Sequence, residues 1–202
     1  MNPKTRNIII ILAVIVLIVL LFVRFIVKSY DRAVAYEEEV TANWANVESA
    51  YQRRSDLIPN LVNTVKGYAQ YEQETFTMVT EARAKATQVT IDPSKLDAQS
   101  IQRFQAAQDG LSSALSRLLM VVEKYPDLKA NQNYLDLQAQ LEGTENRINV
   151  ARNDYNNSVR KYNTHIRGLL RKVAIRIAGG EFERKEPFKA QQGAEVAPTV
   201  QF

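Results

Sequence analysis

Mostly apolar residues recur three and four positions apart over most of the chain. The spacing runs through four separate stretches, residues 30–51, 58–86, 101–125 and 134–162. It keeps one seam of each helix facing its neighbours. The short breaks between stretches favour antiparallel neighbours, so the sequence predicts an all-α, up-down-up-down four-helix bundle. A long parallel coiled coil is the alternative, but four interrupted segments argue against it.

Composition agrees with long helices rather than with a sheet that needs many turns. The 202 residues include 7 Gly and 6 Pro, and long stretches contain neither. The chain has no Cys, which excludes disulfides, thiolate nucleophiles and Cys-ligated metals. The net charge of +4 is mild and matters only where it is concentrated.

An unbroken apolar run, Ile8–Val23, predicts a single-pass transmembrane anchor near the N-terminus. Alone it would span ~24 Å as a helix, against ~30 Å of bilayer core. Extension past a snorkelling Arg24 to Val27 closes that gap, giving an anchor over 8–27 behind a short flank over 1–7. A signal peptide cleaved near Ala33-Val34-Ala35 is the alternative, but charged residues separate that site from the apolar run.

The orientation of the anchor follows only weakly from its flanking charges. Lys and Arg are nearly balanced on its two sides, and carboxylates contribute little to the positive-inside rule. We predict a bacterial inner-membrane protein with its N-terminus inside and a bundle over residues 28–165 in the periplasm.

The stretch QRRSDLIPNLV, residues 52–62, is predicted to be the corner between the first two helices. Arg53 and Arg54 would lie in the last turn of the first helix, where cations complement the helix dipole. Ser55 or Asp56 would cap the second helix, and Pro59 would lie in its first turn, where a missing N–H costs nothing.

Several motifs resemble those of the LemA family. They are Trp44, then QRRSDLIPNLVNTVKGY (Gln52–Tyr68), then Glu72 and Glu81-Ala82-Arg83, with similar later motifs at Tyr125–Asn131 and Tyr155–Asn163. The resemblance implies a membrane-anchored antiparallel helical bundle, widespread in bacteria and without an established enzymatic activity. It runs from the anchor to about Asn163. Beyond that residue the chain departs from the Phe-Pro and Gly-Phe pairs usual in the family.

Residue counting along the predicted helices, at ~1.5 Å per residue, brings two turn motifs together at the end of the bundle away from the membrane. We call this surface the predicted tip and expect it to bind an envelope protein, or another copy in a homo-oligomer. Its polar and aromatic residues are Arg53, Arg54, Asp56, Asn60, Tyr125, Lys129 and Asn131.

Residues 166–178 predict a basic amphipathic helix. Apolar side chains between Ile166 and Ile177 share one arc, and the other carries Arg167, Arg171, Lys172 and Arg176. Such a helix suits the surface of a lipid bilayer. Alternatively, its apolar arc caps the bundle or packs on a neighbouring subunit. Residues 179–202 are predicted to be mostly flexible, with Phe182, Phe188 and Phe202 as local anchors.

Catalytic, metal and cofactor sites are not expected. Ser158-Val159-Arg160-Lys161 matches Ser-x-x-Lys, but the companion elements of a penicillin-binding signature are absent. The single His165 cannot supply paired metal ligands and is expected to be exposed. We therefore expect a non-enzymatic membrane-anchored scaffold or adaptor. The alternative is a lipid-binding or membrane-remodelling protein acting through residues 166–177. The basic segment permits nucleic-acid binding, but the bilayer location and the lack of a groove-reading motif argue against it.

Overall fold

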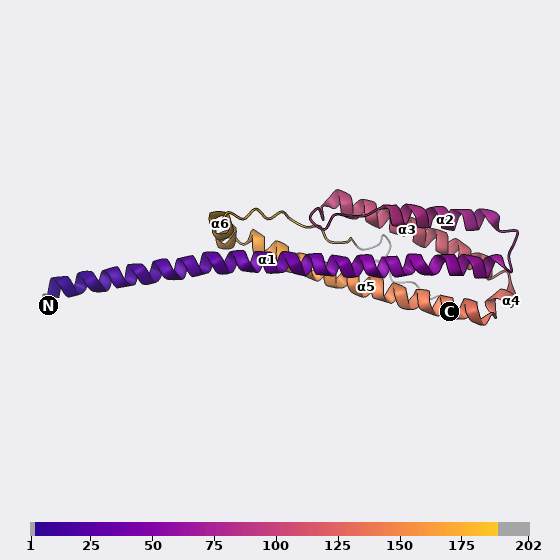
Figure 1. Cartoon of the computed structure of the whole chain (residues 1–202), viewed down its shortest axis with the longest axis horizontal. Helices are drawn as coiled ribbons and strands as arrows, with labels where there is room; N and C mark the ends of the chain where they lie inside the picture. Colours follow the sequence, from indigo (N-terminus) through magenta and orange to yellow (C-terminus); the bar gives the residue numbers. More distant parts are fainter. Residues whose placement is uncertain (1–2, 190–202) are drawn as a thin grey trace, which may run out of the picture. The chain divides into compact units, whose positions relative to one another are not determined.

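The computed structural model describes residues 3–189, and every regular element in that range is a helix (Figure 1). The predicted all-α class is therefore confirmed. The helices are α1 (Pro3–Lys66), α2 (Gln73–Gln88), α3 (Ala98–Val122), α4 (Pro126–Lys129), α5 (Gln132–Arg167) and α6 (Leu169–Ile177). Phe202, one of the predicted anchors of the tail, lies outside the described residues.

The predicted apolar run forms the first part of α1. Within the described residues α1 is the one helix that is long and apolar enough to cross a membrane. None of its most apolar window is buried inside the chain, so these side chains need an apolar environment from elsewhere. The helix continues past the window without interruption to Lys66.

The chain divides into two compact units, each of which draws on both α1 and α5. Unit 1 consists of Met1–Val40 and Ser158–Arg184, and unit 2 consists of Thr41–Asn157 and Lys185–Phe202.

The core of unit 2 is built from five helices. Ile58, Leu61 and Val65 of α1 are buried with residues from the other four, which include Phe76, Val79, Leu111, Leu118, Leu128 and Tyr134. Aromatic rings form a second cluster, in which Trp44 packs edge-on against Phe104 and Tyr155 and stacks on Phe188.

The predicted corner at residues 52–62 is wrong, because this stretch lies inside α1. Pro59 has no N–H to donate to the carbonyl of Ser55, the bond that every other residue type would make in a helix. Arg83 of α2 replaces it, since its Nε donates to the Ser55 carbonyl oxygen over 2.8 Å. The carbonyl that the proline leaves free is thereby satisfied by a side chain from another helix.

The turn that the sequence placed at 55–59 occurs instead at residues 67–72. Backbone bonds from Ala69 N–H to Val65 O and from Glu72 N–H to Ala69 O close this turn, and α2 begins at Gln73 rather than near Pro59. The predicted seam ran through Tyr68 and Glu72 as though the helix continued. The turn resets the register, so Val65 and Ala69 are buried but Tyr68 is 45% exposed.

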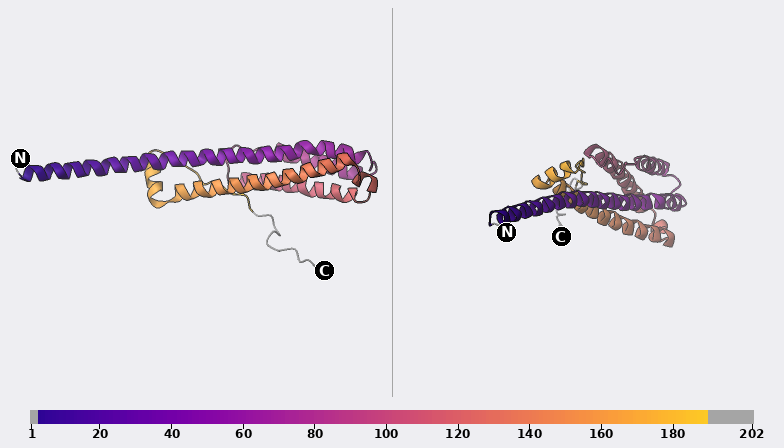
Figure 2. Two further views of the ribbon diagram at one scale, coloured as in Figure 1. Left: turned by 90° about the horizontal axis from the view of Figure 1, so that it is seen from below. Right: turned by 60° about the vertical axis from the view of Figure 1, so that its left-hand side comes forward.

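In unit 1, α6 lies across α1 rather than along it, as its nearly end-on appearance in Figure 1 and its position in Figure 2 show. α6 ends in a Schellman motif, with Gly180 N–H bonded to Ile175 O and Gly179 N–H to Arg176 O, each over 3.0 Å. Gly179 takes the positive φ of 80° that this motif requires. A Cβ on Gly180 would lie 2.9 Å from the Tyr30 ring, so the close approach of this turn to α1 needs glycine.

Residues 181–189 form no helix, yet both predicted aromatic anchors within them pack. Phe182 contacts the Tyr30 ring within unit 1, with centroids 5.8 Å apart. Phe188 is buried within unit 2, against Trp44 and beneath the Arg152 guanidinium. Both aromatic anchors predicted in the described part of the tail therefore pack, because apolar sites are available to the two phenylalanines.

Candidate functional site

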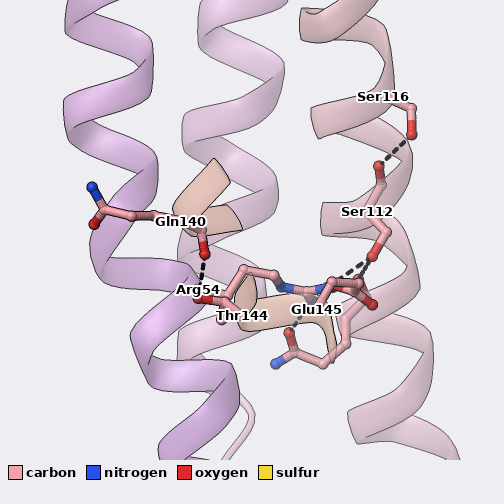
Figure 3. Close-up of polar contacts among 7 residues, drawn as sticks. Arg54, Ser112, Ser116, Gln140, Thr144 and Glu145 are labelled. Carbon is pink, nitrogen blue, oxygen red and sulfur yellow. Dashed lines mark hydrogen bonds and ion pairs between the residues drawn. The ribbon is translucent and has the colours of Figure 1, made fainter. Parts of the chain in front are cut away.

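Arg54, predicted as an exposed anchor of the tip, is buried in unit 2 and only 3% exposed. Its Nη1 donates to Ser112 Oγ over 3.0 Å and lies 3.3 Å from a Glu145 carboxylate oxygen (Figure 3). Its Nη2 donates to Gln108 Oε1 over 2.8 Å. The guanidinium also lies 5.0 Å from the centre of the Tyr51 ring. One side chain thus ties α1 to both α3 and α5.

These contacts make Arg54 a structural residue rather than a surface on which a partner can dock. A buried charge is tolerated only when it is paired and hydrogen-bonded, and the planar guanidinium reaches several acceptors at once. Gln108 is the signal that sequence reasoning passed over. A polar side chain at a seam position, among apolar seam residues of α3, needs a partner inside the core.

Arg53, the preceding residue, is exposed and lines an open groove of about 530 Å³ between α1 and α5 of unit 2. Successive residues of a helix are ~100° apart, which explains why two adjacent arginines face opposite surroundings. The groove has a small apolar bed and a polar rim, with lining residues Asn46, Ser49, Ala50, Arg53, Asn146, Arg147, Val150, Ala151 and Asp154.

The other predicted tip residues on α1 face solvent along the helix rather than at a turn. Asp56 accepts a hydrogen bond of 2.7 Å from Gln52 Nε2, one turn earlier, and Asn60 is exposed. Arg53, Asp56 and Asn60 therefore lie along the solvent-facing side of α1, whereas Arg54 is buried in the core. They do not gather at an end of unit 2.

The predicted tip residues near α4 do lie at a turn, but beside a different neighbour. Tyr125 is half-buried at the start of α4, and Lys129 pairs with Glu123. Asn131 Nδ2 donates to the Tyr68 hydroxyl over 2.9 Å. The turn at 123–131 therefore meets the turn at 67–72, where α1 ends, and not residues 53–60.

The predicted membrane-surface residues Arg167, Arg171, Lys172 and Arg176 are all exposed in unit 1. Four apolar residues of α6 are exposed as well: Leu169 by 80%, Leu170 by 72%, Val173 by 53% and Ile177 by 58%. Ala174 and Ile175 are buried, so only one face of α6 packs within the unit. The apolar arc predicted for this helix is therefore mostly uncovered.

His165 was expected to be exposed, and this expectation is wrong. The ring is 4% exposed, its Nε2 lies 2.9 Å from the Ser29 carbonyl oxygen, and its face meets Tyr36 edge-on. The physical reason is that the last turn of α5 packs against α1 within unit 1, and position 165 faces α1.

The lysine of the Ser-x-x-Lys match, Lys161, pairs with a carboxylate on α1. Lys161 donates to a Glu39 carboxylate oxygen over 2.9 Å, and this hydrogen bond raises the pKa of the Lys161 ammonium. A general base needs the opposite shift. Residues 3–189 also contain no group of three or more His, Cys, Asp or Glu side chains that could hold a metal ion.

Two tyrosines of α5 fix the segment after α6, a role that the sequence reading missed. In unit 2 the Tyr155 hydroxyl donates to Glu186 O over 2.9 Å, and in unit 1 the Tyr162 hydroxyl donates to Glu183 O over 2.8 Å. Burial raises the pKa of both phenols, so each hydroxyl stays a donor. Their spacing of seven on one helix face was the available signal.

Comparison with known proteins yields one family and a few distant relatives. The sequence model of the LemA family matches residues 43–202, which extends past Asn163, where the motif resemblance ended. Magnetosome protein MamQ 2 of Paramagnetospirillum magneticum is 26% identical over 198 residues, covering 90% of this chain and 72% of that protein. Magnetosome protein MamQ of Magnetospirillum gryphiswaldense is 27% identical over 172 residues, covering 77% and 63%. Protein LemA of Metamycoplasma hominis is 26% identical over 120 residues, covering 59% and 51%.

Proposed function

This chain belongs to the LemA family, and on that premise we propose that it is a membrane-anchored, non-enzymatic scaffold or adaptor built on an antiparallel four-helix bundle. The exposed apolar window of α1 supports anchoring in a membrane. The core of unit 2, to which α1, α2, α3 and α5 all contribute, supports a rigid helical body. We further propose an inner-membrane location, a periplasmic bundle and self-association.

The observation that carries the binding role is the groove between α1 and α5. It is open, about 530 Å³ in volume, and has small side chains along its bed, so another backbone can approach closely. Val150 in its lining is 60% exposed and offers an apolar contact. Arg53 thus keeps the partner-binding role first assigned to the predicted tip, now as part of a groove.

Charge favours an acidic segment of another protein as the occupant. Arg53 and Arg147 on the rim make no ion pair within residues 3–189, whereas Asp154 is the one carboxylate among the lining residues. Exposed guanidiniums bind carboxylates in two-point geometry. We therefore propose that the groove binds a helical partner segment that places carboxylates against Arg53 and Arg147.

Photo-crosslinking from inside the groove tests this proposal. A benzoylphenylalanine at position 150 of the full chain, in native membranes, is expected to give one adduct whose partner peptide is rich in Asp and Glu. Arg53→Glu with Arg147→Glu is expected to abolish the adduct. Lys85→Glu with Arg103→Glu, the same charge change at exposed positions on α2 and α3, is expected to retain it.

A reciprocal exchange makes the result specific. Acid-to-lysine changes in the partner peptide are expected to restore the adduct with the Arg53→Glu, Arg147→Glu chain. An adduct of two copies of this chain would refute the proposed occupant and identify a homo-oligomer interface instead. Absence of any adduct, or its survival in the double variant, would refute the groove.

A second candidate function, binding or remodelling of the membrane surface through α6, is favoured by the exposed side chains of that helix. Leu169, Leu170 and Val173 are more than half exposed, and cations flank them. An interfacial helix places such a face at the boundary of the acyl chains and its cations among anionic headgroups.

An environment-sensitive dye on a single introduced cysteine tests this candidate. The chain has no cysteine of its own, so the dye attaches only at the introduced site. A dye on Leu170→Cys in bilayer nanodiscs is expected to report an apolar surrounding. The same dye on Asn153→Cys, an exposed site in unit 2, is expected to report water. Equal, water-like signals from both sites would exclude an interfacial α6.

A further inference from the structure

A pocket of about 330 Å³ in unit 1 gathers cations from three helices. Arg32 comes from α1, Arg160 and Lys161 come from α5, and Arg171 comes from α6. None of its lining residues is a carboxylate. The sequence places these four residues up to 139 positions apart, so only the fold reveals the cluster.

The pocket retains positive charge after the ion pair of Lys161 is taken into account. Lys161 shares its charge with Glu39, which lies outside the lining. Arg32 and Arg171 are exposed, and neither forms an ion pair within the described range. Guanidiniums converging on one concave space match the oxygens of a phosphate group, which they bind through paired N–H donors.

Hydroxyl and aromatic groups complete the wall between the cations. Thr164 contributes an exposed hydroxyl, and Tyr36 lies half-buried beside the His165 ring. The His165 ring is held in place by its contact with the Ser29 carbonyl. The wall therefore adds hydrogen-bonding groups on the part of the pocket that α1 and α5 form.

The position of the pocket along α1 corresponds to the headgroup layer of a bilayer. Arg32 follows the end of the predicted anchor at Val27 by five residues, which is ~7.5 Å of helix. The polar layer on each side of a hydrocarbon core is ~5–7.5 Å thick. Arg171 reaches the same pocket from α6, whose neighbours Leu169 and Leu170 are exposed.

We propose that this pocket binds a phosphate group, with Arg32 and Arg171 as its principal ligands. The phosphate can belong to an anionic phospholipid headgroup or to a soluble phosphate, because both present the same oxygens to the guanidiniums. Only the lipid source rests on the membrane-surface role proposed for α6.

Binding to the purified full chain in neutral detergent tests the site with two probes. Inorganic phosphate is titrated at constant ionic strength against chloride, and phosphatidylglycerol is titrated in mixed micelles against a neutral detergent blank. The variant is Arg32→Gln with Arg171→Gln. The matched control is Lys85→Gln with Arg103→Gln, which removes the same charge at exposed positions of unit 2, outside the pocket lining and away from α6.

We expect at least one probe to bind the parent and the control alike, and the pocket variant to bind it about tenfold more weakly or worse. Loss of phosphatidylglycerol binding alone would identify a lipid headgroup. Loss of inorganic phosphate binding, alone or together with the lipid, would identify a site open to soluble phosphate. If neither probe binds the parent, or the two variants bind equally well, the proposal is overturned.

Leu169→Ser with Leu170→Ser separates this proposal from the role of α6. These changes remove the exposed apolar face but leave the pocket lining intact. Phosphate binding that survives these changes, together with a water-like dye signal from Leu170→Cys in the otherwise unchanged chain, would mean that the pocket is real and the interfacial helix is wrong.

Discussion

Arg53 and Arg54 are adjacent and identical in sequence, yet one faces a groove and the other the core. At the scale of single residues this difference comes only from the ~100° between neighbours on a helix. The sequence grouped them because both were read as belonging to a helix end, where arginines are exposed. Once the helix continues, position 54 falls on the same face as Ile58 and Leu61, and burial follows.

Truncation of the two arginines is expected to have very different effects on stability. Arg54→Ala removes the guanidinium that donates to Gln108 Oε1 and Ser112 Oγ. We therefore expect a loss of about 2–4 kcal/mol in the free energy of unfolding. Arg53→Ala is expected to change it by less than about 0.5 kcal/mol. Urea unfolding followed by circular dichroism measures the loss in each variant. Equal losses in the two variants would contradict the structural role of the buried Arg54.

Tyr155 is expected to make stability fall at high pH. Burial raises the pKa of this phenol, so the folded state keeps its proton where the unfolded chain loses it. The stabilisation is complete below pH ~10, the ordinary tyrosine value, and declines above it by about 1.4 kcal/mol per pH unit. Tyr155→Phe should make the decline shallower, measured by urea unfolding between pH 8 and 11. Tyr71→Phe, which alters a 97% exposed ring, is the control, and identical slopes for both variants would reject the assignment.

At the scale of helices, the regularly spaced stretches could be predicted. The place where a helix continues through a proline, because another side chain satisfies the free carbonyl, could not. The three-four spacing identified the buried face of α3, where Ile101, Leu111 and Leu118 are all buried as expected. It failed at Pro59, because local rules treat proline as a helix boundary. The compensating donor, Arg83, lies 24 positions further along the chain, and nothing local connects the two.

The pairing of Pro59 with Arg83 predicts a measurable coupling. Arg83→Met removes the donor and leaves the Ser55 carbonyl unsatisfied, at an expected cost of about 1–3 kcal/mol. In a Pro59→Ala background the restored N–H satisfies that carbonyl, so the same Arg83 change should cost about 1 kcal/mol less. A double-mutant cycle by urea unfolding isolates this difference, independently of the change in helix propensity. Strictly additive effects would show that Arg83 does not act through the missing N–H.

At the scale of the whole molecule, the helix apolar enough to cross a membrane and the family could be predicted from the sequence. The candidate sites could not. The apolar run and the motifs around Trp44 lie within short windows, and both the helix and the family match agree with them. The groove and the cationic pocket each combine residues from helices far apart in sequence. Such sites follow from packing, which a one-dimensional pattern does not contain.

The side of the membrane that holds the bundle decides which partners the groove can meet. We predict the periplasm, and a single thiol tests it because the chain has no cysteine. Asn153→Cys places that thiol at an exposed position of α5 in unit 2. A membrane-impermeant maleimide is expected to label it in intact cells whose outer membrane has been made permeable, with lysed cells as the positive control. Labelling only after lysis would place the bundle in the cytosol, reverse the orientation of the anchor, and make cytosolic proteins the candidates for the acidic partner segment.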